Sequence, residues 1–217
     1  MKCLKYIFFS LFFFSFPLYG EEESLTAALI TGKDKIYQDK FEYKSDQLKG
    51  VFLSYEKKNF GIEGFLTFNH DRERFFSSYL QKNTKINENL FFRLYIGGFF
   101  HDLKTKPFRF QSTSLRRKSF FFGPLLGNEF KINLPFKSSL LLKTQFHKLY
   151  AKHKQTSQSH LERKQKQSSG FLYQIKINKK ISNDDEVFFS YLFDATRTKI
   201  FWGSRSSYFL IGVKTSF

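Results

Sequence analysis

Two His-Asp dipeptides, His70-Asp71 and His101-Asp102, contain residue types that can catalyse hydrolysis. A carboxylate that orients an imidazole helps it to activate a water molecule. Successive residues of a strand point to opposite faces, however, so the two side chains of such a dipeptide do not converge on one substrate. The acidic dipeptide at 184–185 falls in a segment that we expect to be a tight turn at the opposite end of the molecule. These pairs therefore predict no catalytic site.

Metal ligands do not cluster along the sequence either. The five histidines are scattered, and they show no spacing typical of a metal site. The single cysteine, Cys3, lies close to the N-terminus. We therefore expect no metal, no cofactor and no enzymatic activity.

Positive charge is concentrated in two segments, 101–118 and 151–167. The first holds six basic residues and one acidic residue, and the second holds five and one. These basic residues are Lys104, Lys106, Arg109, Arg116, Arg117, Lys118, Lys152, Lys154, Arg163, Lys164 and Lys166. Clustered cations attract polyanions through an interaction that weakens with salt. We treat these residues as a candidate polyanion-binding rim.

The elements that position these residues are predicted to be strands, because apolar and polar residues alternate along most of the chain. The clear alternating segments are 41–56, 59–69, 88–101, 118–132, 137–151, 167–180, 187–195 and 204–217. Two further segments, 24–32 and 73–84, alternate more weakly. With the weak segments counted there are ten strands, and without them there are eight.

The lengths of the connections favour ten strands. The connections at 56–59, 84–88, 132–137 and 180–184 are tight, whereas those at 33–40, 69–73, 101–118, 151–167 and 196–204 are mostly longer. Tight turns on one side and long loops on the other are typical of an outer-membrane barrel. The expected fold is therefore all-β, an antiparallel up-and-down transmembrane β-barrel of ten strands, with eight as the alternative.

A soluble barrel with an apolar interior would show the same alternation. The membrane is favoured because the apolar face is rich in aromatic residues, while the polar face carries charges that are costly in a dry core. These lumen charges are Glu63, Arg93, Glu129, Lys143, Lys176 and Asp194. In a narrow barrel they are expected to form an ion-paired plug; the alternative is a small pore with a weak preference for anions.

The composition and the N-terminus indicate an exported, folded protein. The chain has 217 residues with 32 Phe, 11 Tyr and a formal net charge of +17. This aromatic content argues against disorder, and a mean hydropathy of −0.40 argues against a bundle of membrane-spanning helices. Residues 1–20 combine two lysines with a short apolar run, which is typical of a cleaved signal peptide. We expect residues 21–217 to form the barrel.

The export signal, the closing strand and the terminal Phe217 together resemble the Gram-negative outer-membrane β-barrel class. In the closing strand Phe209, Ile211 and Val213 are in phase with Phe217, whereas Thr215 departs from the apolar residue usual at its position. The resemblance implies an outer-membrane location, contact with outer-membrane lipid and recognition of this strand by the barrel-assembly machinery. It identifies a class, and a class does not determine a function.

The sequence favours a non-enzymatic, monomeric outer-membrane barrel with a basic extracellular rim. The expected partners are the polyanion lipopolysaccharide or, in an adhesin-like role, anionic components of a host or its matrix. Nucleic acid is not expected, because the chain is exported. Two alternatives stay open: a small porin-like transport channel, and a surface hydrolase similar to the omptins.

Overall fold

The computed structural model describes residues 23–38, 41–44, 47–68, 72–104, 108–110, 113–156, 161–198 and 202–217, so the expected signal peptide lies outside the described residues. The strands are β1 (Glu23–Gln38), β2 (Phe41–Lys44), β3 (Leu48–Lys57), β4 (Phe60–Thr67), β5 (Arg72–Lys85), β6 (Leu90–Lys104), β7 (Phe108–Phe110), β8 (Thr113–Leu134), β9 (Ser138–Thr156), β10 (Leu161–Lys180), β11 (Asp185–Thr198) and β12 (Trp202–Ser216). Within these residues no helix is long and apolar enough to cross a membrane.

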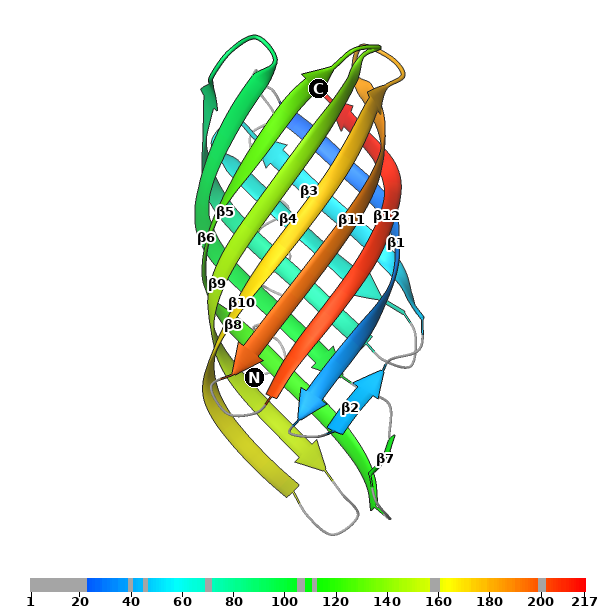
Figure 1. Ribbon diagram of the computed structural model, residues 1–217, viewed down its shortest axis with the longest axis vertical. Helices are drawn as coiled ribbons and strands as arrows, with labels where there is room; N and C mark the ends of the chain where they lie inside the picture. Colours follow the sequence, from blue (N-terminus) through cyan, green and yellow to red (C-terminus); the bar gives the residue numbers. More distant parts are fainter. Residues whose placement is uncertain are drawn as a thin grey trace.

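Ten of the strands form a closed antiparallel barrel, which confirms the predicted number (Figure 1). Neighbouring wall strands pair in chain order, and β12 pairs with β1 to close the ring. The two short strands lie outside this count, since β2 continues the hairpin from the end of β1 and β7 pairs with the start of β8.

Both weakly alternating segments are wall strands, 24–32 within β1 and 73–84 within β5. Their alternation is weak because small residues, Ala27 and Ser78, occupy outward positions. Apolar side chains such as Ile30 and Phe75 are buried on the inward face of the same strands. These two segments form strands because they pair with their neighbours in the closed ring, and not because of their own sequence pattern.

The tight turns are found where they were predicted, at 58–59, 86–89, 135–137 and 181–184. They lie together at one end of the barrel, called here the turn end (top of Figure 1). The opposite end is called here the loop end. The prediction of long loops there was wrong, because the described residues of 101–118 and 151–167 are mainly in strands. Strand β9 runs on to Thr156 and β10 starts at Leu161, directly opposite it.

These strand extensions escape the sequence pattern because polar residues occupy both of their faces. Backbone hydrogen bonds between neighbouring strands hold a ladder whatever the side chains are. Periodicity therefore detects the half of a strand that lies beside an apolar band and misses the half that extends beyond it.

The apolar face of the strands points outward, as expected. Exposed side chains include Leu29 at 66%, Ile96 at 61% and Ile211 at 63%. The lumen is filled by inward side chains, and its buried aromatic residues are Phe52, Phe65, Phe75, Tyr79, Tyr95, Phe99, Phe121, Phe188 and Tyr208. The sequence pattern predicted charges on the inward face but not an aromatic interior of this extent.

Glycines on neighbouring strands make room for the large inward rings. A Cβ added at Gly127 would lie 2.3 Å from Cζ of Tyr95, which is its partner in the ladder. The Tyr95 hydroxyl donates a hydrogen bond to the Thr144 carbonyl at 2.9 Å, which satisfies the polar end of the ring. The interior is therefore packed and does not form an open channel at this level.

Candidate functional site: the basic belt and the filled lumen

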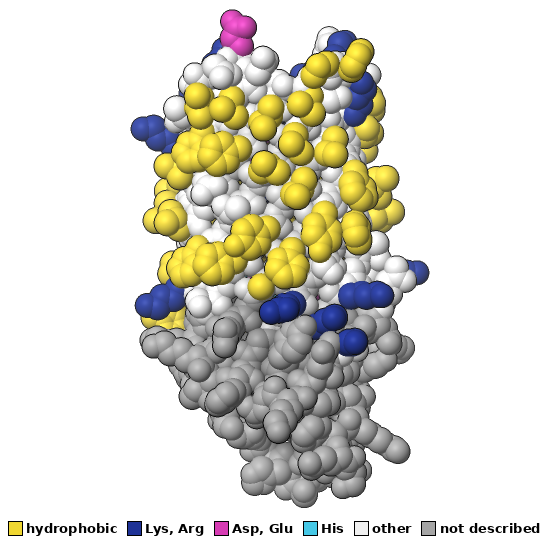
Figure 2. Space-filling view, in the orientation of Figure 1, with side chains coloured by type: hydrophobic (Ala, Val, Ile, Leu, Met, Phe, Trp, Pro, Cys, Tyr) yellow, Lys and Arg dark blue, Asp and Glu magenta, His cyan; other side chains and the backbone are white. Residues whose placement is uncertain are grey.

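The outer surface of the barrel carries an apolar band bounded by cations. Figure 2 shows hydrophobic side chains spread over the wall, with Lys and Arg along the edge of the band that faces the loop end. Exposed members of the band come from many strands: Leu29, Leu53, Leu80, Ile96, Leu126, Ile175, Phe189 and Ile211. An outward apolar surface of this kind matches the lipid-facing surface of a membrane barrel.

The cations at this edge form a basic belt around the barrel, which we define by its exposed residues. They are Lys33, Lys35, Lys44, Lys49, Arg74, Lys118, Lys148 and Arg205. Each lies in the part of its strand nearer the loop end. Among the loop-end residues whose side chains the structure describes, no carboxylate is exposed: Asp34, Glu73 and Asp194 are buried and Asp102 is half-buried. These described side chains therefore give the outer surface at the loop end an excess of positive charge.

Two residues of the predicted rim lie at this belt. Lys118 belongs to it, and Lys104, which is half-buried, is opposite Lys118 on the neighbouring strand. The strand register aligns five basic residues in one row across β5, β6, β8, β9 and β10: Arg72, Lys104, Lys118, Lys154 and Arg163. Like charges opposite each other on neighbouring strands repel, so this row does not stabilise the barrel by itself. A row of positive charges does attract anions.

The other rim residues occupy the same end of the barrel. Arg109 is in β7, Arg116 and Arg117 are in β8, Lys152 is in β9, and Lys164 and Lys166 are in β10. Lys106 lies outside the described residues. Of the belt, the sequence analysis identified only Lys118, because the other members lie outside the two basic segments and are spread over several strands.

The loop-end half of the lumen contains a buried group of acids and histidines, called here the outer cluster. Glu73 and His101 are in contact, with 2.5 Å between Oε1 and Nε2, and the Tyr208 hydroxyl donates to the other Glu73 oxygen. Asp194 lies between the two histidines, 4.0 Å from Nδ1 of His101 and 3.6 Å from Nε2 of His147. All five residues are at most 4% exposed.

Aromatic rings enclose this cluster. The His147 ring stacks on Phe99 with 4.6 Å between centroids, and His101 meets Phe65 and Phe75 edge-on at 6.5 Å. Within the described residues, no group of His, Cys, Asp and Glu has an arrangement that could hold a metal ion. In the described part of the barrel, the acids and histidines of this cluster are thus buried among aromatic rings.

The His101-Asp102 dipeptide does not bring its two side chains together. His101 points inward and is 2% exposed, whereas Asp102 is on the opposite face of the strand. His70 and Asp71 lie outside the described residues. The sequence analysis did not single out Glu73 or His147; their inward positions follow from strand parity, but their meeting depends on the register between distant strands.

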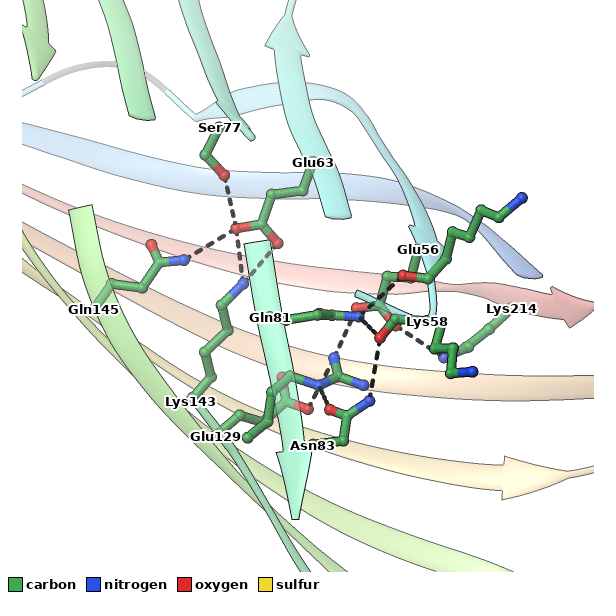
Figure 3. A network of polar contacts seen from close by, with 12 residues as sticks. Glu56, Lys58, Glu63, Ser77, Gln81, Asn83, Glu129, Lys143, Gln145 and Lys214 are labelled. Atoms are coloured by element: carbon green, nitrogen blue, oxygen red, sulfur yellow. Dashed lines mark hydrogen bonds and ion pairs between the residues drawn. The ribbon is translucent and has the colours of Figure 1, made fainter. Parts of the chain in front are cut away.

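The turn-end half of the lumen contains an ion-pair network, called here the inner network (Figure 3). Its centre is Glu63, whose two carboxylate oxygens both lie 2.7 Å from Nζ of Lys143. Ser77 and Gln145 donate further hydrogen bonds to Glu63 at 3.1 and 3.2 Å. This carboxylate is buried, with its side chain 8% exposed, and all of these partners satisfy it.

The remaining predicted lumen charges lie in three different surroundings. Arg93 pairs with Glu56 at 3.1 Å and with Glu129 at 3.4 Å, and so belongs to the inner network. Asp194 lies instead in the outer cluster. Lys176 has its ammonium 3.9 Å from the centroid of the Phe188 ring. Parity alone predicts that these residues face inward, but not which of them meet.

The predicted assembly residues are exposed along the outer face of β12. Phe209 is 48% exposed, Ile211 63%, Val213 43% and Phe217 75%. The terminal residue still joins the ladder, because the amide of Phe217 donates to the carbonyl of Glu23 at 2.9 Å. The strand is thus available to a recognition partner on its outer face while it closes the ring.

Comparison with known proteins gives structural matches only. The outer membrane protease OmpT of Escherichia coli is similar with a TM-score of 0.65 and 8% identity, over 94% of this chain and 99% of that chain. Ail, the attachment invasion locus protein of Yersinia pestis, is similar with a TM-score of 0.47 and 11% identity, over 92% of this chain and 100% of that chain. The chain matches no protein-family model and no curated protein. At this level of identity the likeness concerns the fold alone, and the chain has the fold of the Gram-negative outer-membrane β-barrels.

Proposed function

We propose that the protein is a non-enzymatic outer-membrane barrel whose loop end faces outward and binds polyanions. The observation that carries this proposal is the basic belt, where eight exposed cations from seven strands lie on the loop-end side of the apolar band. Because these side chains project outward from the wall, the anions nearest to them are those of the surrounding membrane surface. The phosphate groups of lipopolysaccharide are anions of this kind. Outer-membrane lipid is expected to surround the apolar band.

Electrostatics supports this partner. Each contact between a lysine or arginine and a phosphate is charge-assisted and therefore shorter and stronger than a neutral hydrogen bond. Basic residues that lie close to an anionic membrane surface contribute about 1 kcal/mol each. A belt that surrounds most of the ring adds several such contacts, so modest individual energies sum to a stable interaction. The rim residues beyond the belt extend the same charge toward soluble polyanions, including those of a host surface.

The surroundings of the outer cluster support a non-enzymatic role. Catalysis requires that a reacting group reach its substrate within about 3 Å. Glu73, His101 and His147 are at most 2% exposed, and aromatic rings surround them. The same packing, together with the inner network, argues against the alternative of a passive channel. Planar-bilayer recording decides this point: a filled lumen gives flat traces after verified insertion, whereas discrete conductance steps favour the channel.

Retention on a heparin column tests the polyanion proposal. The folded protein in detergent is expected to elute at clearly higher salt than a belt variant carrying Lys33→Gln, Lys49→Gln and Lys148→Gln. A matched variant with Lys82→Gln, Lys85→Gln and Lys137→Gln removes as many exposed lysines from the turn end. Equal elution of both variants would contradict a binding surface at the loop end, since net charge alone would then explain retention.

Location and orientation have their own test. Cell fractionation is expected to recover the protein with the outer membrane, and a protease added to intact cells is expected to cut within the segments 101–118 or 151–167. Recovery in the soluble periplasm would overturn the proposal.

A further inference from the structure

The turn-end half of the lumen encloses a cavity of about 70 Å³, lined by more cations than anions. The charged lining residues are Arg93, Lys131, Lys143, Lys176 and Lys214 against Glu56, Glu63, Glu129 and Glu186. Five positive charges against four negative ones leave an excess of one. An excess charge in a confined, poorly solvated space is costly unless a counter-ion accompanies it.

Three of the four carboxylates already have cationic partners. Lys143 holds Glu63 at 2.7 Å. Arg93 lies 3.1 Å from Glu56 and 3.4 Å from Glu129, and Lys214 approaches Glu56 at 3.4 Å. These pairs use three cations for three carboxylates. The excess positive charge therefore lies with the residues that remain, Lys131 and Lys176 against Glu186.

Lys131 and Lys176 form no ion pair within 4.0 Å among the residues that the structure describes. The ladder places both of them opposite Leu141, so they flank the same position of β9 on β8 and β10. Both line the cavity. The Phe188 ring lies 3.9 Å from the Lys176 ammonium, and this contact stabilises a cation but supplies no negative charge.

Hydroxyl groups line the cavity from another part of the ring. Thr26 of β1 and Ser54 of β3 are opposite each other in the ladder and also border the cavity. In the ring order β1 lies across the barrel from β8. A tetrahedral oxyanion has oxygens that point in several directions, so it can accept from the ammonium groups on one side and from hydroxyl groups on the other.

We propose that this cavity is a binding site for one small inorganic oxyanion, such as phosphate, held between Lys131 and Lys176. A water molecule needs roughly 10–15 Å³ of such cavity volume, so the cavity has room for a small inorganic oxyanion. The ion neutralises the excess charge and joins β8 and β10 to the opposite wall. The site is separate from the basic belt, which lies on the outer face at the other end.

Calorimetric titration of the folded full-length protein with inorganic phosphate tests the site. Saturable binding of one phosphate per chain is expected. Lys176→Met removes one charge-assisted hydrogen bond and is expected to weaken binding about tenfold or more. Glu186→Gln raises the positive excess and is expected to tighten binding severalfold. Lys137→Gln, which changes an exposed lysine in the turn after β8, is expected to leave the affinity unchanged.

The test has two variants whose phosphate affinities are expected to change in opposite directions. If Lys176→Met fails to fold, Lys131→Met replaces it, and Glu186→Gln measures the same charge balance with the other sign. Absence of saturable phosphate binding in the unaltered protein would overturn the proposal. So would equal affinities for the Lys176→Met and unaltered proteins, or chloride binding as tightly as phosphate at matched ionic strength.

Discussion

The Glu63–Lys143 pair gives the sharpest prediction about the lumen. Both carboxylate oxygens lie 2.7 Å from the ammonium, and the side chains are 8% and 5% exposed. The rings of Tyr79 and Tyr95 lie with their centroids 5.2 Å from the same ammonium. Lys143→Met keeps much of the volume of the side chain but leaves the carboxylate buried with only its two neutral donors, Ser77 and Gln145.

The expected loss follows from how dry the site is. Removing one partner of a buried ion pair costs about 3–5 kcal/mol, whereas exposed pairs contribute roughly 0.2–1 kcal/mol. Lys143→Met is therefore expected to lower the free energy of unfolding by about 3 kcal/mol or more. Glu63→Gln with Lys143→Met removes both charges together, and is expected to recover at least half of that loss because no unpaired charge remains buried.

Urea titration of the folded protein, followed by circular dichroism and by the heat-dependent gel mobility of barrels, measures these differences from the midpoint and slope. Lys118→Met is the matched control, because this lysine is exposed in the belt, and a change within about 0.5 kcal/mol is expected. A loss below about 1 kcal/mol for Lys143→Met would refute the reasoning, since the pair would then behave as one in open water.

Three further predictions concern packing, backbone strain and assembly. Gly170→Ala should destabilise the barrel by about 1–3 kcal/mol in the same titration, because the added Cβ would lie 2.1 Å from Nε2 of His147, and an unchanged midpoint would contradict this close approach. Lys137→Gly should stabilise it by roughly 1 kcal/mol, because Lys137 has φ 55°, and a lower midpoint would argue against strain in this turn. Phe217→Ser should reduce the assembled, heat-modifiable fraction recovered from cells, and an unaltered yield would remove the terminal aromatic residue from the assembly signal.

The alternation of apolar and polar residues was sufficient to predict eight of the ten wall strands. A face of Phe209, Ile211 and Val213 lies outward as expected, and the tight turns define which strands are neighbours. The eight clear segments have this outward apolar face in common. The segments 24–32 and 73–84 were recoverable only because the connection lengths required two more strands.

The loop end was harder to predict because apolar alternation disappears there. Strands β9 and β10 continue as a paired ladder through 151–156 and 161–167, where both faces are polar. The belt is hidden for the same reason. Lys49 and Lys148 are single charges at the end of an apolar face, and neighbouring strands bring such residues together without a run of charges in the sequence.

The lumen clusters depend on register, which the sequence pattern does not contain. Glu63 and Lys143 are 80 residues apart in the sequence, and they meet across the narrow lumen although three strands lie between their own strands in the ring. Parity predicted that both point inward. It did not predict that Asp194 lies apart from them, beside His101 and His147 in the other half of the lumen.

The most direct test of the account is the effect of lipopolysaccharide on the thermal unfolding of the barrel. Unaltered protein is expected to unfold at a higher temperature with intact lipopolysaccharide than with the dephosphorylated form, because phosphates neutralise the belt. The variant with Lys33→Gln, Lys49→Gln and Lys148→Gln is expected to lose most of this difference, while the turn-end lysine variant keeps it. Equal unfolding temperatures of the unaltered protein with the two lipids would contradict the claim that the belt binds polyanionic lipid.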